Sequence, residues 1–187
     1  MSDAADNGAL AGGGIATRVE ALGYRSLRHV AQDLDAFHVL VGPNASGKST
    51  FLDVLAFLGD LVKAGAAAAI EGDTRLGIPH RAPDGRQLCW LQEGSRIELA
   101  VEFRIPTHRL AMLKNGKEKA CRYELALDVG GPLRVASETL WLKPPTEPHP
   151  TQRTLFPSIA QPPANIVRLL GKHAPAGWRK VLWRGED

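Results

Sequence analysis

A short glycine-rich run has the residue types that a chain needs to hold a phosphate group. Gly42 and Gly47 enclose four residues and are followed by Lys48 and Ser49, which fits the pattern G-x-x-x-x-G-K-[ST]. Glycines let the backbone turn back so that amide N–H groups point into one concavity, and a helix that begins there adds the positive end of its dipole. We therefore predict a phosphate-binding loop, whose members are Gly42, Pro43, Asn44, Ala45, Ser46, Gly47, Lys48, Ser49 and Thr50.

The fixed positions of this Walker A pattern predict separate tasks. Lys48 is the candidate catalytic residue, because its ammonium would reach the β- and γ-phosphates and neutralise charge that shifts during phosphoryl transfer. The Ser49 hydroxyl is the candidate Mg²⁺ ligand, and Thr50 is expected to donate to the α-phosphate. The competing interpretation is a glycine-rich strand-to-helix turn that binds nothing, and it leaves the sequence Gly-Lys-Ser-Thr over residues 47–50 unexplained.

The segments on either side of the loop must position it. Residues 37–41, Phe-His-Val-Leu-Val, are nearly continuous in apolar residues, which is typical of a strand covered on both faces. After the loop, apolar residues recur at helical spacing, which predicts a helix over residues 48–62. The residues that recur at this spacing are Phe51, Leu52, Leu55, Leu58 and Leu61. Strand, loop and helix in this order are the context that a Walker A loop requires.

The other predicted elements are strands. Alternation from Ile15 onwards, followed by Tyr-Arg-Ser-Leu at residues 24–27, indicates a strand, a turn and another strand. Residues 96–104 and 122–129 alternate apolar with polar or small residues, which predicts strands buried on one face. Turn signals at residues 115–116 and 130–132 indicate an antiparallel meander that ends near Leu142.

Composition divides the chain into four parts. Residues 1–14 are mostly small or polar and are expected to form a disordered tail, whereas residues 15–142 form the predicted nucleotide-binding lobe. Seven prolines punctuate residues 143–164, which predicts a linker or an exposed loop. Residues 165–187 are expected to be a tail that holds a short helix and a basic-aromatic stretch, at residues 166–170 and 178–184.

The bulk composition is that of a soluble globular chain. The 187 residues carry a net charge of +3, with 44% apolar and 23% charged residues, which disfavours both general disorder and a membrane protein. No apolar run approaches the roughly 20 residues that span a bilayer, and the acidic N-terminus is unlike a secretory signal, so we expect the cytoplasm. Cys89 and Cys121 lack the spacing of a zinc site or a disulfide framework, and the six histidines form no ligand pattern.

Two segments together resemble a known family. The first segment is Tyr-Arg-Ser-Leu at residues 24–27, and the second is Val-Leu-Val-Gly-Pro-Asn-Ala-Ser-Gly-Lys-Ser-Thr-Phe-Leu-Asp-Val-Leu at residues 39–55. They resemble the N-terminal lobe of AAA-family ATPases of the ABC type, the RecF, SMC and OLD-like proteins. The resemblance covers about residues 15–142. It implies an α/β P-loop NTPase lobe joined to an antiparallel β-subdomain, ATP as the nucleotide, and Arg25 as a phosphate or nucleotide contact.

Other features of that family are missing from this sequence. We find no signature helix that opens with Leu-Ser-Gly-Gly, no Walker B strand that ends in Asp-Glu and no histidine switch. A Walker B aspartate holds Mg²⁺ and its neighbouring glutamate polarises water, so we expect binding of ATP with very slow turnover. The expected partner is a missing C-terminal lobe or a second chain. By analogy alone, the complete ATPase would act on DNA or in defence against foreign DNA.

Three other functions compete with an ATPase lobe. Asp128 and Gly131 match the Asp-x-x-Gly motif of GTPases, but Asp128 falls on the polar side of an alternating strand, and no Asn-Lys-x-Asp guanine reader follows. A nucleotide kinase would need lid arginines, and Arg75, Arg81 and Arg86 are interpreted instead as a solvated surface. A non-catalytic module that keeps ATP as a structural ligand stays open. The stretch 178–184 fits either stacking on single-stranded nucleic acid or, preferably, packing against the missing lobe.

Overall fold

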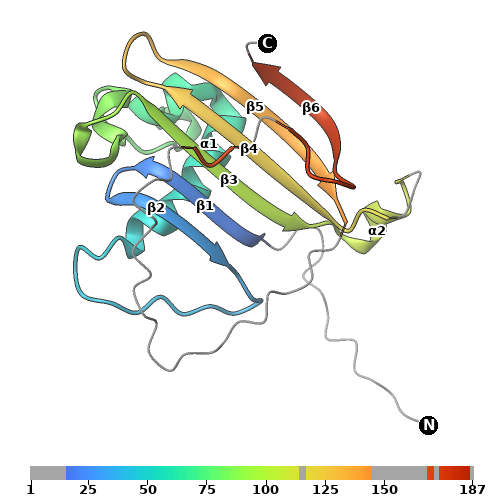
Figure 1. The fold of residues 1–187 in the computed structure, drawn as a ribbon. Helices are drawn as coiled ribbons and strands as arrows, with labels where there is room; N and C mark the ends of the chain where they lie inside the picture. The colour runs from blue at the N-terminus through green and yellow to red at the C-terminus, as the bar shows by residue number, and fades with distance from the viewer. Residues whose placement is uncertain (1–15, 114–116, 145–167, 171–172, 186–187) are drawn as a thin grey trace.

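One antiparallel sheet organises the molecule (Figure 1). The computed structural model describes residues 16–113, 117–144, 168–170 and 173–185. The sheet has six strands in the order β2-β1-β3-β4-β5-β6, and every neighbouring pair is antiparallel. Its members are β1 (Ala16–Tyr24), β2 (Leu27–Asp33), β3 (Arg96–Arg104), β4 (Ala120–Asp128), β5 (Arg134–Lys143) and β6 (Arg179–Gly185). The fold is therefore mixed α/β, and the predicted strand-turn-strand start and the β3-β4-β5 meander are confirmed.

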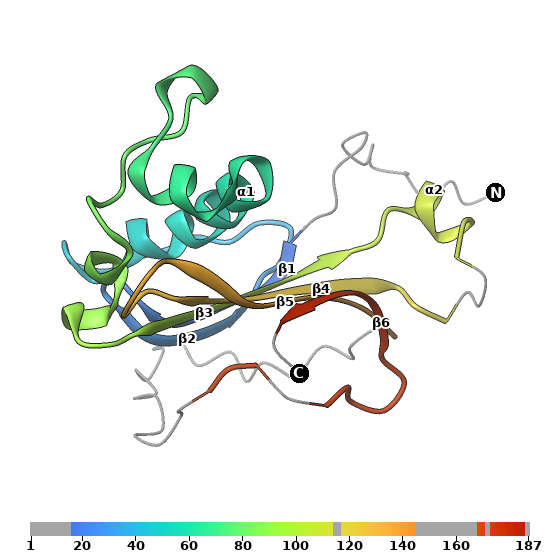
Figure 2. The ribbon, with the colours of Figure 1, turned by 90° about the horizontal axis from the view of Figure 1, so that it is seen from above.

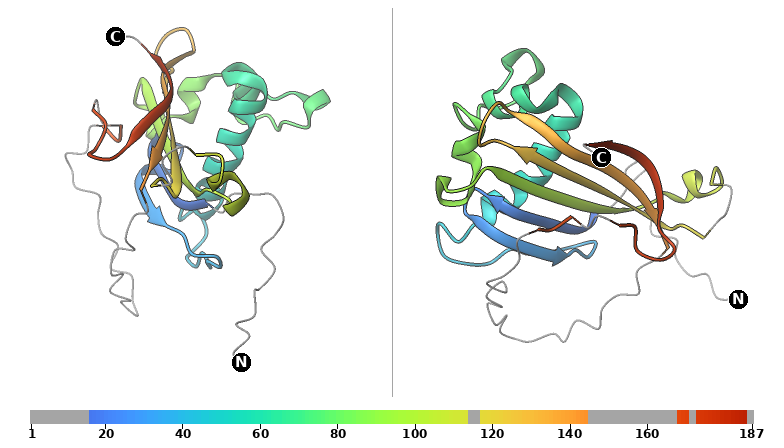
Figure 3. Two further views of the ribbon diagram at one scale, coloured as in Figure 1. Left: turned by 90° about the vertical axis from the view of Figure 1, so that its right-hand side faces the viewer. Right: turned by 45° about the horizontal axis from the view of Figure 1, so that its top comes forward.

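A single long helix, α1 (Lys48–Glu71), covers one face of this sheet. Short helical turns surround it and the sheet edge: η1 (Thr74–Leu76), η2 (Gly85–Leu88), η3 (Trp90–Gln92) and α2 (Thr107–Leu110). Residues 168–170 and 173–178 lie on the opposite side of the sheet from α1 (Figures 2 and 3). The described part of the chain therefore has a helix layer, a sheet layer and a thin C-terminal layer.

The core lies between α1 and the sheet. Phe51, Val54, Leu58 and Leu61 recur every three or four residues, so they share the face of α1 that packs on the strands. The strand residues that meet them are spaced by two along each strand, as residues on one face of a sheet are. They include Val19, Ala21, Ile97, Leu99, Val101, Leu125 and Leu127. The predicted start of the helix at Lys48 is confirmed. The helix extends beyond the predicted end at Val62, and a kink at Gly65, with φ 84°, joins its first piece to a second helical piece.

The other face of the sheet is buried too, which contradicts the prediction of strands buried on one face. Arg122 on β4 donates to Glu20 at 2.6 Å, to Glu124 at 2.7 Å and to Glu102 at 3.3 Å. Lys143 donates to Glu102 at 2.6 Å. We call these five side chains the ionic face. Alternating charge showed which residues share a face, and mutual ion pairing is what allows that face to be buried.

The predicted strand over residues 37–41 is wrong. This segment has no regular secondary structure, and Phe37 and Val41 are 83% and 87% exposed. An apolar strand covered on both faces needs a neighbouring strand on each side and a layer above and below it. The described residues supply none of these to residues 37–41, although Leu40 packs partly against the core.

The C-terminal stretch completes the sheet. Residues 179–185 form β6 and pair with β5, so the basic-aromatic stretch is an edge strand that its sequence pattern did not predict. Residues 168–170 are not helical, and the backbone N–H groups of Leu169 and Leu170 donate to Glu98 on β3 at 2.6 and 3.1 Å. The rest of the expected short helix, the expected tail over 1–14 and the proline-rich residues 145–164 lie outside the described residues. In the described part of the chain, no helix has the length and apolar character to cross a membrane.

Candidate phosphate-binding site

The glycine-rich loop leads from the exposed segment 37–41 into the first turn of α1. Its backbone takes left-handed conformations at Ala45, with φ 63°, and at Gly47, with φ 91°. A Cβ on Gly47 would lie 3.1 Å from Leu27 Cδ2, and a Cβ on Gly42 would lie 2.9 Å from Ser46 Oγ. A side chain at position 42 would therefore displace the Ser46 hydroxyl, and a side chain at position 47 would crowd Leu27 and be strained by the left-handed backbone.

Lys48 folds back over the loop that precedes it. Its Nζ donates to the carbonyl oxygens of Gly42 at 2.7 Å and Pro43 at 2.6 Å, and it lies 3.2 Å from Ser46 Oγ. The side chain thus closes the loop into a ring and holds a positive charge at its inner side. An ammonium has three N–H donors, and these three oxygens match that number.

A hollow of about 290 Å³ lies at this loop, lined by Ser26 and by every residue from Asn44 to Thr50. The structure therefore brings together seven of the nine predicted site residues, while Gly42 and Pro43 contribute their carbonyl groups to Lys48. The first amides of α1 precede its first hydrogen bond, from Phe51 N to Gly47 O at 2.8 Å. Such amides have no carbonyl partner within the helix, which makes a helix start favourable for an anion.

The chemistry of the lining is that of an anion site. Lys48 supplies a cation, Ser26, Ser46, Ser49 and Thr50 supply hydroxyls, and none of the lining residues is acidic. Ser26 was not predicted as a site residue. Its Oγ donates to Thr50 Oγ1 at 2.9 Å, which places the β1–β2 turn against the first turn of α1. Its place in the Tyr-Arg-Ser-Leu segment was the only sequence signal for it.

Arg25, which the family resemblance implied as a nucleotide contact, adjoins this hollow without lining it. Its guanidinium donates to Asp53 on α1 at 2.7 Å, and its side chain is 36% exposed. Arg25 also takes a left-handed conformation, with φ 51°. Its backbone thus turns sharply between β1 and β2, directly before Ser26.

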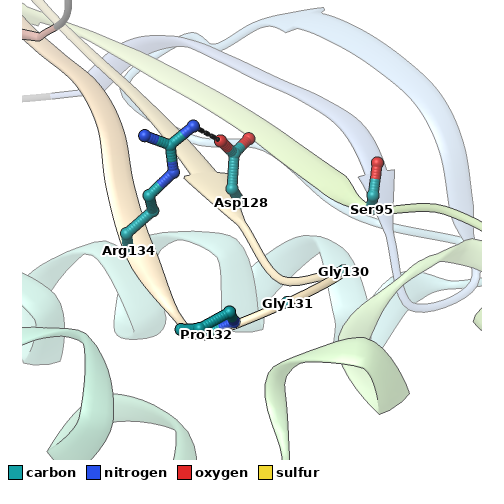
Figure 4. A pocket seen from close by; sticks show the side chains of 6 residues that line it. All are labelled: Ser95, Asp128, Gly130, Gly131, Pro132 and Arg134. Atoms are coloured by element: carbon teal, nitrogen blue, oxygen red, sulfur yellow. Dashed lines mark hydrogen bonds and ion pairs between the residues drawn. The ribbon is translucent and has the colours of Figure 1, made fainter.

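A larger hollow, of about 430 Å³, lies at the β4–β5 hairpin (Figure 4). Asp128, the candidate GTPase aspartate, lines this hollow together with Ser95, Gly130, Gly131, Pro132 and Arg134. Its carboxylate is paired with Arg134 at 2.7 Å and with Arg96 at 3.5 Å. We favour the smaller hollow as the functional site, because it combines a helix start, a cation and four hydroxyls.

The remaining candidate side chains have structural partners. The interpretation of Arg75, Arg81 and Arg86 as a solvated surface is wrong for Arg81, whose side chain is 3% exposed and paired with Asp53 and Asp60. Burial raises the pKa of both Cys89 and Cys121, so neither is an activated thiol. Among the residues that the structure describes, no three His, Cys, Asp or Glu side chains are grouped so as to hold a metal ion.

Three comparisons relate this chain to known proteins. No curated protein matches the sequence significantly. A solved structure from a study of the structural biochemistry of ATP-driven dimerization and DNA-stimulated activation of SMC ATPases is similar over 68% of each chain, with 21% sequence identity and a TM-score of 0.42. Residues 37–148, more than half of the chain, match the sequence model of the family described as "AAA domain, putative AbiEii toxin, Type IV TA system", and the chain therefore belongs to this family of AAA domains.

Proposed function

We propose that this chain binds ATP together with Mg²⁺ through residues 42–50, as the N-terminal part of an ABC-type AAA-family ATPase. Membership of an AAA domain family supports nucleotide binding in general. The observation that carries the specific proposal is the hollow at the start of α1, where Lys48 closes the glycine loop and no acidic side chain is present among the lining residues.

Each lining group has a task in this proposal. The loop amides and Lys48 bind the β- and γ-phosphates, and the Thr50 hydroxyl donates to the α-phosphate. The Ser49 hydroxyl is an oxygen donor of the kind that Mg²⁺ prefers, so the residues present fit the cation. When bound, Mg²⁺ would neutralise part of the phosphate charge. Arg25 is a second cation that adjoins the hollow, where its guanidinium is paired with Asp53.

Hydrolysis needs more than these groups supply. In-line attack on the γ-phosphate requires a positioned water and a carboxylate or equivalent group to orient it. The lining residues contain hydroxyls, an amide and one ammonium, but no carboxylate. We propose that a C-terminal lobe or a partner chain completes the ATPase. The complete ATPase would act on DNA or in defence against foreign DNA. A non-catalytic ATP-binding module is the second candidate, and a GTPase is the third.

Titration with a fluorescent ATP analogue and Mg²⁺ tests the proposal. Lys48→Ala removes a charged partner of the phosphates and is expected to weaken binding by about tenfold to hundredfold. Lys63→Ala is the matched control, since Lys63 also lies on α1 but donates to Leu76 O at 2.7 Å, away from the hollow. Equal affinities of the unmodified chain and Lys48→Ala would contradict the assignment. Displacement by GTP as effective as by ATP would favour the GTPase.

A further inference from the structure

A group of charged side chains lies beside the phosphate hollow without lining it. Arg81, in the segment after α1, donates through Nε to Asp53 Oδ1 at 3.0 Å and through its NH1 nitrogen to Asp60 Oδ2 at 2.8 Å. Asp53 also receives hydrogen bonds from Tyr24 and Arg25. We call Tyr24, Arg25, Asp53, Asp60 and Arg81 the Arg81 cluster. It joins β1, the β1–β2 turn, α1 and the segment that follows α1.

Arg81 is held firmly at the centre of this cluster. Its side chain is 3% exposed, its NH1 nitrogen also donates to Ala69 O at 2.9 Å, and its guanidinium lies 5.2 Å from the centre of the Phe57 ring. Burial alone would lower the pKa of Arg81, but hydrogen bonds to Asp60 and Asp53 raise it above its ordinary value. A buried guanidinium with such partners stays charged, and removing one partner would leave an uncompensated charge.

Asp53 connects Arg81 to the hollow. It lies four residues after Ser49 on α1, so the two side chains share one side of the helix. Its Oδ2 accepts from Tyr24 Oη and from an NH1 nitrogen of Arg25, both at 2.7 Å. Tyr24 and Arg25 directly precede Ser26, which contacts Thr50 and lines the hollow. The position of Ser26 therefore depends on where Asp53 holds the turn.

We propose that Arg81 is a positioning residue of the phosphate site, which acts through Asp53 and Arg25 to hold Ser26 against Thr50. This inference rests on the proposed function of the hollow. Among the described residues, the hydrogen-bond and ion-pair partners of the Arg81 side chain are Asp53, Asp60 and Ala69, none of which lines the hollow, so its effect on a bound phosphate must pass through the β1–β2 turn. Among the partners of Asp53, the Arg25 side chain is 36% exposed, whereas the Arg81 side chain is 3% exposed and Tyr24 is fully buried.

Nucleotide affinity and folding stability, measured on the same variants, test this inference. Arg81→Met keeps the length and apolar contacts of the side chain but loses both ion pairs, and we expect affinity for the Mg²⁺-ATP analogue to fall about tenfold, as is common when a supporting partner is lost. Arg81→Lys, which can still pair with one carboxylate, should recover part of it. Arg75→Met is the matched control, because Arg75 lies in the same segment with its side chain 86% exposed.

A double-mutant cycle with Ser26→Ala separates positioning from general destabilisation. If Arg81 acts through the turn, Ser26→Ala weakens binding in the unmodified chain and has little further effect in Arg81→Met, so the two losses are not additive. All affinities are measured well below the unfolding transition of each variant. Should Arg81→Met fail to fold, Asp53→Asn in the same cycle carries the test, since Asn keeps the size of Asp53 and an acceptor for Tyr24.

The outcomes distinguish this inference from the proposed function. Wild-type affinity in folded Arg81→Met, or additive losses in the cycle, would overturn the positioning role while the loss of binding in Lys48→Ala still supports the phosphate site. Absence of binding by the unmodified chain would overturn both. A reduced melting temperature with unchanged affinity would assign Arg81 to folding alone.

Discussion

The two faces of the sheet are both buried, but apolar contacts stabilise one and ion pairs stabilise the other. On the face toward α1, side chains such as Leu99 and Leu125 are removed from water by apolar contact, which contributes about 25 cal/mol for each Å² and has no preferred direction. On the ionic face, Arg122 satisfies three carboxylates at once, and Lys143 satisfies one of them again. Such a network is favourable only when every member keeps its partners.

The two faces should therefore differ in how strongly a substitution affects the phosphate hollow. The apolar face supports α1, whose first turn carries the phosphate hollow, so its packing is felt at the site. The ionic face links β1, β3, β4 and β5, and its residues alternate along β1, β3 and β4 with the apolar residues that pack with α1. We expect changes to the ionic face to alter stability and its dependence on pH. Their effect on nucleotide affinity should be small as long as the sheet stays folded.

The largest expected effect is the loss of Arg122. Arg122→Met leaves Glu20, Glu102 and Glu124 buried without their shared cation, which is expected to lower the free energy of unfolding by about 3–5 kcal/mol. Urea denaturation measures the free energy of unfolding of the unmodified chain and of the variant. Arg134→Met is the control, because the Arg134 to Asp128 pair is half-exposed and such pairs contribute only about 0–1 kcal/mol. Similar small losses in both variants would show that the ionic face adds little to stability.

An apolar truncation should cost somewhat less and should behave differently with pH. Leu125→Ala, on β4 and facing α1, removes three carbons from a core residue that is 1% exposed, and we expect a loss of about 2–5 kcal/mol. No titratable group is lost, so the loss should be the same at neutral and mildly acidic pH. A loss that changes strongly across this range would mean that the two faces are coupled.

The smallest effect concerns acid stability. Burial would raise the pKa of Glu20, but hydrogen bonds from Arg122 and Arg18 lower it below its ordinary value. Because the folded-state pKa is the lower one, the contribution of Glu20 is complete above the unfolded pKa and is lost as pH falls through the folded pKa. Unfolding free energy should therefore fall from about pH 5 downward, and fall less steeply in Glu20→Gln. Parallel pH curves for the two proteins would contradict this.

The sequence predicted what is encoded locally. The glycine loop, the start of α1 at Lys48 and the strands β3 and β4 follow from a motif, a helical repeat and a period of two. The period could not show that Glu98 and Glu102 are buried, because it reports which residues share a face and not what covers them. The same limit made residues 37–41 look like a covered strand. Apolar composition indicates a need for cover, and the cover itself depends on distant segments.

Side chains that act through distant partners were also beyond the sequence. Arg81 lies among other arginines and near Gly and Pro residues, which indicates an exposed loop, and only the fold brings it to Asp53. Ser26 reaches the hollow because the β1–β2 turn meets the first turn of α1. In β6 every residue from Arg179 to Arg184 is exposed, so no alternation marked this stretch as a strand.

The placement of the tryptophans decides what intrinsic fluorescence can report. Of the four in the chain, three gather where β6 joins β5: Trp141 and Trp178 have ring centres 6.2 Å apart, and Lys180 lies over both Trp141 and Trp183. The fourth, Trp90, lies beneath Arg28, and none of the four lines the phosphate hollow. Tryptophan emission therefore reports mainly on the C-terminal edge of the sheet and should change when β6 separates from β5. To measure nucleotide binding in the hollow, a fluorophore on the nucleotide is needed instead.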